Sequence, residues 1–130
     1  MAIEPDPDNF RLLRKNAKNA QAARGALISE RKATVPLYVN RGTMAGSHST
    51  TKFNGRIVKE VPAFCFADVL KDFQPTHIKT DCEGAEFDLF GSATSPKLPK
   101  MVKAIVGEVH LRNKLWLPLV APMVERLKAQ

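Results

Sequence analysis

The stretch from His77 to Glu86 constrains the fold more than any other part of the chain. Its sequence, His-Ile-Lys-Thr-Asp-Cys-Glu-Gly-Ala-Glu, starts with a run typical of a short β-strand and ends in acidic residues. Gly84 permits a sharp turn, and residues 85 to 90 can then begin a helix. The stretch therefore predicts a strand, a tight turn and a helix in close succession.

Two carboxylates and a lysine are predicted to gather where this strand ends. In a strand with a period of two residues, Lys79 and Asp81 share one face, and Glu83 joins them if the strand extends that far. Ligands of open α/β sheets bind at the carboxyl ends of the strands, so all three residues are candidate site residues. A plain strand-to-helix turn, with Glu86 in the first helical turn, would explain the same acids without any ligand.

The remaining apolar runs alternate between strands and helices. Strands are expected at residues 26–28, 35–39, 57–66 and 104–109, and helices at 7–23, 67–73 and from 113 onward. Asp6 is a suitable N-cap and Pro7 suits the first helical position, whereas Pro118 and Pro122 can delay the start of the last helix. Residues 104–109 are the most apolar and are expected to form a fully buried strand. The alternation predicts an α/β fold with a mostly parallel sheet and a hairpin inserted around residues 35 to 66.

The composition is typical of one globular domain without a membrane segment. Of the 130 residues, 44% are hydrophobic and 25% are charged. No apolar run approaches the ~18 residues of a membrane-spanning helix, and we recognise no signal peptide at the N-terminus. Cys65 and Cys82 are too few for a disulfide framework, so we expect free thiols in a cytoplasmic protein.

Residues 40 to 54 are rich in Gly, Ser, Thr and Asn and predict a mobile loop.

The positive charge is spread along the chain rather than concentrated. The formal net charge is +7, which permits an anionic partner. Only one local group of basic residues stands out, on the first predicted helix: Arg11, Arg14, Lys15 and Lys18. A solvated helix face is the simpler interpretation of this group, so we do not expect a nucleic-acid partner.

Two further acidic positions follow strand-like runs. Glu4 closes a short extended piece just before the first helix. Nucleoside-binding sheets place an acidic residue at such a position, because a carboxylate can accept hydrogen bonds from two neighbouring ribose hydroxyls. An acid that merely flanks a helix is the alternative. Glu108 and His110 are two residues apart at the end of another strand, so they are expected to share a face.

The three acidic segments together resemble the FkbM-type methyltransferases, which are S-adenosylmethionine-dependent enzymes of the Rossmann-like class. The resemblance rests on Ile-Glu-Pro-Asp-Pro-Asp-Asn-Phe at 3–10, Ile-Lys-Thr-Asp-Cys-Glu-Gly-Ala-Glu at 78–86 and Val-Gly-Glu-Val-His at 106–110. The family also has a Gly/Ser-rich loop where Gly-Ser-His-Ser stands at 46–49. The order and spacing match over nearly the whole chain.

This resemblance implies transfer of a methyl group from S-adenosylmethionine to a hydroxyl group of a small molecule or sugar. It implies that Glu4 holds the ribose, that Ser29 and Glu30 meet the adenine, and that Asp81 lies near the methyl donor. The catalytic residues that it implies are Lys79, Asp81, Glu83, Glu108 and His110. The general base would be Asp81, Glu108 or His110, and the sequence does not choose among them.

The family's first strand and glycine-rich turn have no counterpart in the sequence. The resemblance therefore implies a single partial methyltransferase domain over residues 1–130, with an incomplete Rossmann-like class I sheet. It leads us to expect a second chain or a dimer that completes the sheet, and weak binding of S-adenosylmethionine by this chain alone. An inactive remnant that keeps the fold is consistent with the same departure.

Two other functional classes remain open. A divalent-metal-dependent enzyme would use Asp81, Glu83, Glu108 and His110, since oxygen ligands with one imidazole suit Mg²⁺ or Mn²⁺. A non-catalytic binding module would keep the methyltransferase fold and use the basic helix face on an anionic partner. Metal-dependent activity would favour the first class, and a salt-sensitive interaction would favour the second.

Overall fold

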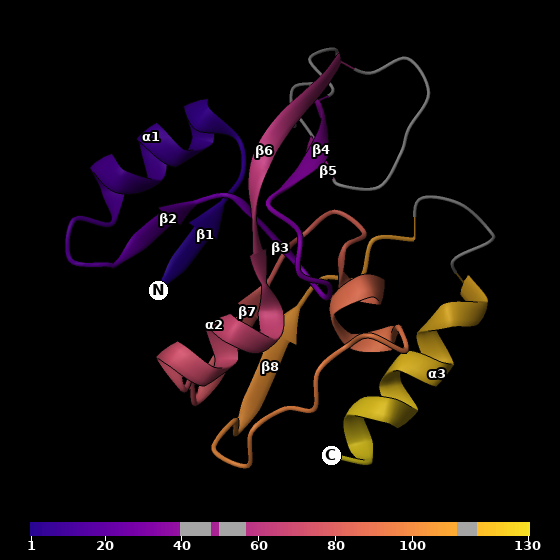
Figure 1. Ribbon diagram of the computed structural model, residues 1–130. Helices are drawn as coiled ribbons and strands as arrows, with labels where there is room; N and C mark the ends of the chain where they lie inside the picture. Colours follow the sequence, from indigo (N-terminus) through magenta and orange to yellow (C-terminus); the bar gives the residue numbers. More distant parts are fainter. Residues whose placement is uncertain (40–47, 50–56, 112–116) are drawn as a thin grey trace.

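The computed structural model describes residues 1–39, 48–49, 57–111 and 117–130 (Figure 1). The loop predicted at residues 40 to 54 lies outside these residues, apart from a two-residue strand. The predicted start of the last helix, near residue 113, also lies outside them.

Strands and helices alternate along the described chain, as the sequence predicts. The strands are β1 (Ala2–Glu4), β2 (Ala22–Arg24), β3 (Ala26–Ile28), β4 (Thr34–Val39), β5 (His48–Ser49), β6 (Ile57–Cys65), β7 (His77–Thr80) and β8 (Ala104–Gly107). The helices are α1 (Pro7–Asn16), α2 (Phe66–Phe73), α3 (Leu117–Lys128) and a π-helical turn, η1 (Phe87–Gly91). No helix among them is both long and apolar enough to cross a membrane.

The strands form three separate sheets within the described residues. One sheet pairs β1 with β2, a second has the order β3-β6-β4-β5, and a third pairs β7 with β8. All pairs are parallel except those of β4, which runs antiparallel to β5 and β6. The mixed α/β class and the inserted hairpin are thus confirmed. The expected Rossmann-like arrangement is met only as parallel pieces.

Two of these sheets meet at a single glycine. β2 and β3 are two halves of one extended segment that is interrupted at Gly25, whose N–H donates to the carbonyl of Glu4 over 3.2 Å. A Cβ at Gly25 would lie 2.5 Å from the Phe64 ring and 2.8 Å from the Pro62 carbonyl oxygen. Any larger residue would push β6 away, so glycine is required for this close approach.

Helix α1 begins where the sequence predicts but ends much earlier. Asp6 caps it, because its Oδ1 accepts hydrogen bonds from the N–H groups of Asp8 (2.9 Å) and Asn9 (3.1 Å). The predicted end at residue 23 is wrong, since the helix stops at Asn16 and β2 follows. The alanines of this stretch favour a helix by intrinsic propensity, and the pairing of β2 with β1 overrides that preference.

The core consists of two apolar clusters. The first lies within the four-stranded sheet and contains Ala26, Ile28, Val35, Leu37, Val39 and Val61. The second joins α2, η1 and α3 and contains Phe66, Leu70, Leu89, Phe90 and Met123. In it, the rings of Phe66 and Phe90 meet edge to face with centroids 5.5 Å apart. Helix α3 lies against η1 in Figure 1, and Met123 is the residue that it buries there.

Strand β8 is not the fully buried strand that its apolar sequence predicts. Val106 is 66% exposed, and Val109, just beyond the strand, is also exposed. Only Ile105 packs against the second cluster. The prediction is wrong because β8 pairs only with β7 among the described residues and only one of its faces is covered.

Candidate functional site

A buried carboxylate holds the turn that follows β7. Glu86 is only 1% exposed and accepts hydrogen bonds from the N–H groups of Cys82 and Gly84, each over 2.7 Å. The backbone is left-handed at Glu83 (φ 53°) and Gly84 (φ 104°), a geometry that costs energy at a non-glycine residue. Glu86 therefore fixes a strained turn in the segment that carries Asp81 and Glu83.

The pairing of β7 with β8 brings the next acids side by side. The two strands run parallel with Thr80 opposite Gly107, so Asp81 and Glu108 follow at neighbouring strand ends. The N–H of Glu108 also donates to the carbonyl of Thr80 over 3.3 Å, which continues the pairing by one step. The parallel register thus places two carboxylates at the same edge of this sheet.

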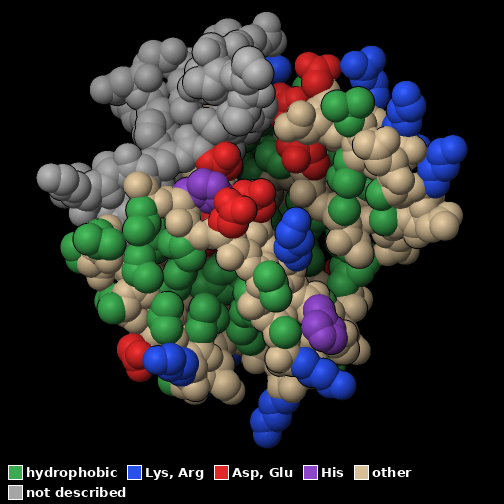
Figure 2. Space-filling model, turned by 180° about the vertical axis from the view of Figure 1, so that it is seen from behind, with side chains coloured by type: hydrophobic (Ala, Val, Ile, Leu, Met, Phe, Trp, Pro, Cys, Tyr) green, Lys and Arg blue, Asp and Glu red, His purple; other side chains and the backbone are tan. Residues whose placement is uncertain are grey.

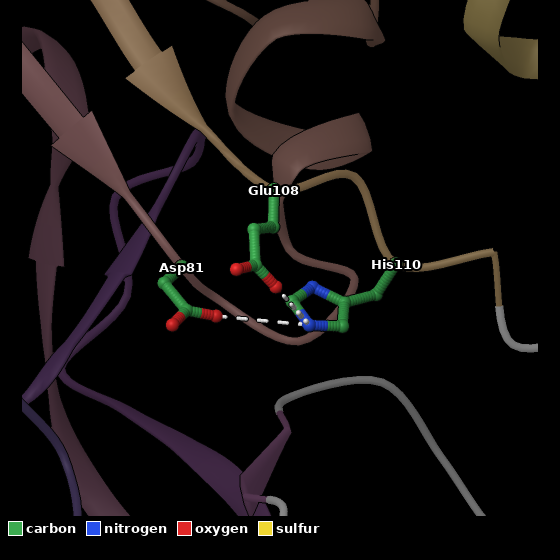
Figure 3. Close-up of side chains that lie close together, drawn as sticks. All are labelled: Asp81, Glu108 and His110. Atoms are coloured by element: carbon green, nitrogen blue, oxygen red, sulfur yellow. Dashed lines mark ion pairs between the residues drawn. The ribbon is translucent and has the colours of Figure 1, made fainter.

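The imidazole of His110 lies beside these two carboxylates, and an ion pair joins it to each of them (Figure 3). Its Nε2 is 3.7 Å from Asp81 Oδ1, 3.7 Å from Glu83 Oε2 and 3.6 Å from Glu108 Oε2. On the other side of the ring, its Nδ1 is 3.6 Å from Glu86 Oε1. We call this group of Asp81, Glu83, Glu86, Glu108 and His110 the His110 cluster.

The His110 cluster concentrates negative charge at one edge of the β7–β8 sheet. Four carboxylates close together repel one another, and a cation between them relieves this repulsion. The side chains of Asp81 and Glu108 are 56% and 76% exposed, whereas that of His110 is only 22% exposed. The cluster is therefore open to solvent on the Asp81 and Glu108 side, where a cationic or hydroxyl-bearing ligand can approach.

Three members of the cluster have the chemistry to hold a metal ion. One ligand atom from each of Asp81, Glu108 and His110 lies within 4.8 Å of the other two. Carboxylate oxygens with an imidazole nitrogen suit Mg²⁺ or Mn²⁺. Among the described residues, Glu83 is not part of this group, although the sequence placed it in the metal-binding set. Because two of the three side chains are exposed acids, the arrangement needs no ion to form.

Cys82 follows β7 and lies next to Asp81. Burial raises the pKa of its thiol to about 11, and the charges of Glu86, Asp81 and Glu4 add to this effect. Glu4 is therefore within electrostatic reach of the residue next to Asp81. Its Oε1 also accepts a hydrogen bond from the N–H of Asp6 over 2.8 Å.

Ser29 and Glu30, which are predicted to meet the adenine, do not belong to the His110 cluster. The N–H and the hydroxyl of Ser29 both donate to the Asp88 carboxylate, over 2.8 and 2.6 Å, and Glu30 pairs with Lys32 over 2.7 Å. A pocket of about 310 Å³ opens here, lined by Ile28, Ser29, Glu30, Lys32, Val35, Pro36, Ala85 and Asp88. Ser29 ties β3 to η1 in this pocket, a role that its sequence position does not reveal.

The structure gathers most, but not all, of the predicted catalytic residues. Lys79 lies on the exposed face of β7, and no ion pair joins it to Asp81 in the part of the chain that is described. Glu86 enters the cluster, although its sequence position predicts only a helix-flanking acid. The one signal for its role is its spacing: it follows Gly84 by two residues and can reach back to the N–H groups of the turn.

Parallel strand pairs with an acidic cluster at their carboxyl ends are typical of α/β proteins that bind ligands at this edge. The family model of the methyltransferase FkbM domain matches residues 1–130, so the chain belongs to the FkbM methyltransferase family. No curated protein and no solved structure matches the chain.

Proposed function

We propose that this chain catalyses the S-adenosylmethionine-dependent transfer of a methyl group to a hydroxyl group of a small molecule or sugar. Family membership supports a methyltransferase. One observation supports a hydroxyl group as the acceptor: the His110 imidazole lies among four carboxylates at strand ends. A hydroxyl group must lose its proton during methylation, and this arrangement suits a proton acceptor.

The residues fit the proposed cofactor in charge and polarity. S-adenosylmethionine supplies an electrophilic methyl group on a positively charged sulfur. The carboxylates of the His110 cluster favour such a charge, and Glu4 has the acceptor oxygens that ribose hydroxyls require. The pocket beside Ser29 and Glu30 has a volume of about 310 Å³, and its lining is half apolar and half polar or charged. The apolar part suits the flat adenine ring, and the polar part suits its nitrogen atoms. Ligand pockets start at about 300 Å³, so this pocket suits one part of the cofactor rather than all of it.

Within this proposal His110 is the general base. The acceptor hydroxyl gives its proton to Nε2, and the carboxylates of Asp81 and Glu108 stabilise the imidazolium that forms. Glu86 lies on the buried side of the ring, with its Oε1 3.6 Å from Nδ1. The exposed oxygens of Asp81 and Glu108 can also accept hydrogen bonds from further hydroxyl groups, which supports an acceptor with several hydroxyls, such as a sugar.

The decisive experiment compares two histidine variants. Transfer of a labelled methyl group from S-adenosylmethionine is measured over a panel of hydroxyl compounds. We expect His110→Gln to lower kcat by about 100- to 10,000-fold, the range of a lost general base. His77→Gln is the matched control, because His77 is exposed at the start of β7 and, among the described residues, its ring forms a hydrogen bond only with Thr76 (3.0 Å). Equal activities of the two folded variants would refute the role of His110.

Binding of the cofactor is tested separately from catalysis. We expect Glu4→Gln to weaken the binding of S-adenosylhomocysteine. The affinity is measured by NMR titration, because this method also detects weak binding. Glu125→Gln is the control, since Glu125 is an exposed acid on α3 that pairs with Lys128 over 3.0 Å. Equal affinities would show that Glu4 does not bind the cofactor.

The two free thiols, Cys65 and Cys82, support our proposal that the protein works in the reducing cytoplasm.

A further inference from the structure

A second pocket lies at the end of α1, away from the His110 cluster. Its volume is about 330 Å³, and it is lined by Phe10, Arg14, Ala17, Lys18, Ala20 and Ala22. Ala22 is the first residue of β2 and pairs with the start of β1, whereas Glu4 stands at the opposite end of β1. The pocket is therefore at the amino ends of these strands, opposite to the end that carries Glu4.

The walls of this pocket combine positive charge with apolar surface. Arg14 and Lys18 are exposed, and neither side chain forms an ion pair or hydrogen bond within the described part of the chain. The ring of Phe10 and the three alanines supply the apolar wall. A guanidinium binds phosphate through two parallel hydrogen bonds, and an ammonium adds a compact charge.

We propose that this pocket binds a small molecule that carries a phosphate monoester on an apolar or aromatic group. The protein has a net charge of +7, and Figure 2 shows several Lys and Arg side chains along one edge of this face of the molecule. The carboxyl end of α1 carries a partial negative charge that opposes an anion. Binding must therefore come from the Arg14 and Lys18 side chains, which makes their replacement decisive.

The same helix offers a matched control. Arg11 and Lys15 are also exposed and basic on α1, but they do not line the pocket. The double variants Arg14→Ala/Lys18→Ala and Arg11→Ala/Lys15→Ala remove the same charge from one short segment. Arg11, Arg14 and Lys15 lie on α1, and Lys18 lies two residues beyond its end. Only Arg14 and Lys18 line the pocket.

The test titrates phenyl phosphate into the full 130-residue chain and follows backbone amides by NMR. We expect shifts at the pocket alanines, and tighter binding of phenyl phosphate than of inorganic phosphate or phenol. The Arg14/Lys18 variant should bind at least about ten-fold more weakly, the effect of losing one charge-assisted hydrogen bond. The Arg11/Lys15 variant should bind as the unchanged protein does, and the same spectra report whether each variant is folded.

Several results would overturn the proposal or narrow the class of ligand. Equal weakening by both double variants would indicate a diffuse polyanion surface, and a short duplex DNA bound in the same way would identify nucleic acid as the partner. If millimolar phenyl phosphate shifts no amide resonance, the pocket does not bind the proposed ligand.

Phe10→Leu keeps both cations and should weaken the binding of phenyl phosphate but not that of inorganic phosphate. Unchanged binding of phenyl phosphate by this variant would contradict the aromatic part of the ligand.

Discussion

Replacing Glu86 by glutamine tests the structural basis of the site with little change in shape. The carboxylate is almost fully buried and accepts the N–H groups of Cys82 and Gly84, both over 2.7 Å. A glutamine amide has one acceptor oxygen, and its NH₂ group would face the other N–H donor. One backbone donor is then left buried without an acceptor.

The expected destabilisation follows from these two hydrogen bonds. Losing one charge-assisted bond and weakening the other to a neutral one costs about 2–4 kcal/mol. Glu86→Ala removes both acceptors and leaves a gap, so its cost should be larger, about 3–6 kcal/mol. The free energy of unfolding of a small domain is about 5–15 kcal/mol, so the alanine variant approaches the limit of folding.

The assay is urea unfolding followed by circular dichroism, with hydrogen exchange of the Cys82 and Gly84 amides as a local readout. We expect a lower midpoint for Glu86→Gln at an unchanged slope, and faster exchange at both amides. Glu125→Gln, which changes an exposed acid, should leave the midpoint unchanged. If Glu86→Gln unfolds at the same urea concentration as the unchanged protein and the two amides exchange no faster, Glu86 does not hold this turn.

Three further predictions address the sheet, the thiol and the metal. Gly107→Ala should lower the free energy of unfolding, measured in urea, by about 1–3 kcal/mol. The added Cβ would overlap Oγ1 of Thr80 and lie 2.5 Å from the Thr80 carbonyl oxygen. A urea midpoint equal to that of the unchanged protein would contradict the close pairing of β7 and β8. The raised pKa of Cys82, about 11 against an ordinary value of 9.0, means that the unfolded thiol ionises first as pH rises. The free energy of unfolding should therefore fall as the pH rises between these two pKa values, and it should fall less steeply with pH in Cys82→Ala. Equal slopes in the two proteins would count against burial of the thiol. The proposed methyl transfer requires no divalent ion, so a chelator should leave its rate unchanged; activity that depends on Mg²⁺ or Mn²⁺ would instead favour the metal-dependent alternative.

Short-range signals in the sequence correctly located most elements. Asp6 and Pro7 fixed the start of α1, because a cap and a proline act on the adjacent N–H groups alone. The alternation in residues 77 to 80 predicted a strand, and β7 occupies these residues with Ile78 packed on the second cluster and Lys79 exposed. These features depend only on neighbouring residues, so the order of residues is sufficient to predict them.

The sequence also placed Asp81, Glu108 and His110 at strand ends, and this was enough to propose a shared site. Which side chains converge was decided only by the parallel register of β7 and β8 and by the buried Glu86. The early end of α1 and the exposure of Val106 likewise depend on what pairs with or covers each segment. Pairing and coverage come from residues distant in the chain, and for this physical reason only the tertiary structure decided them.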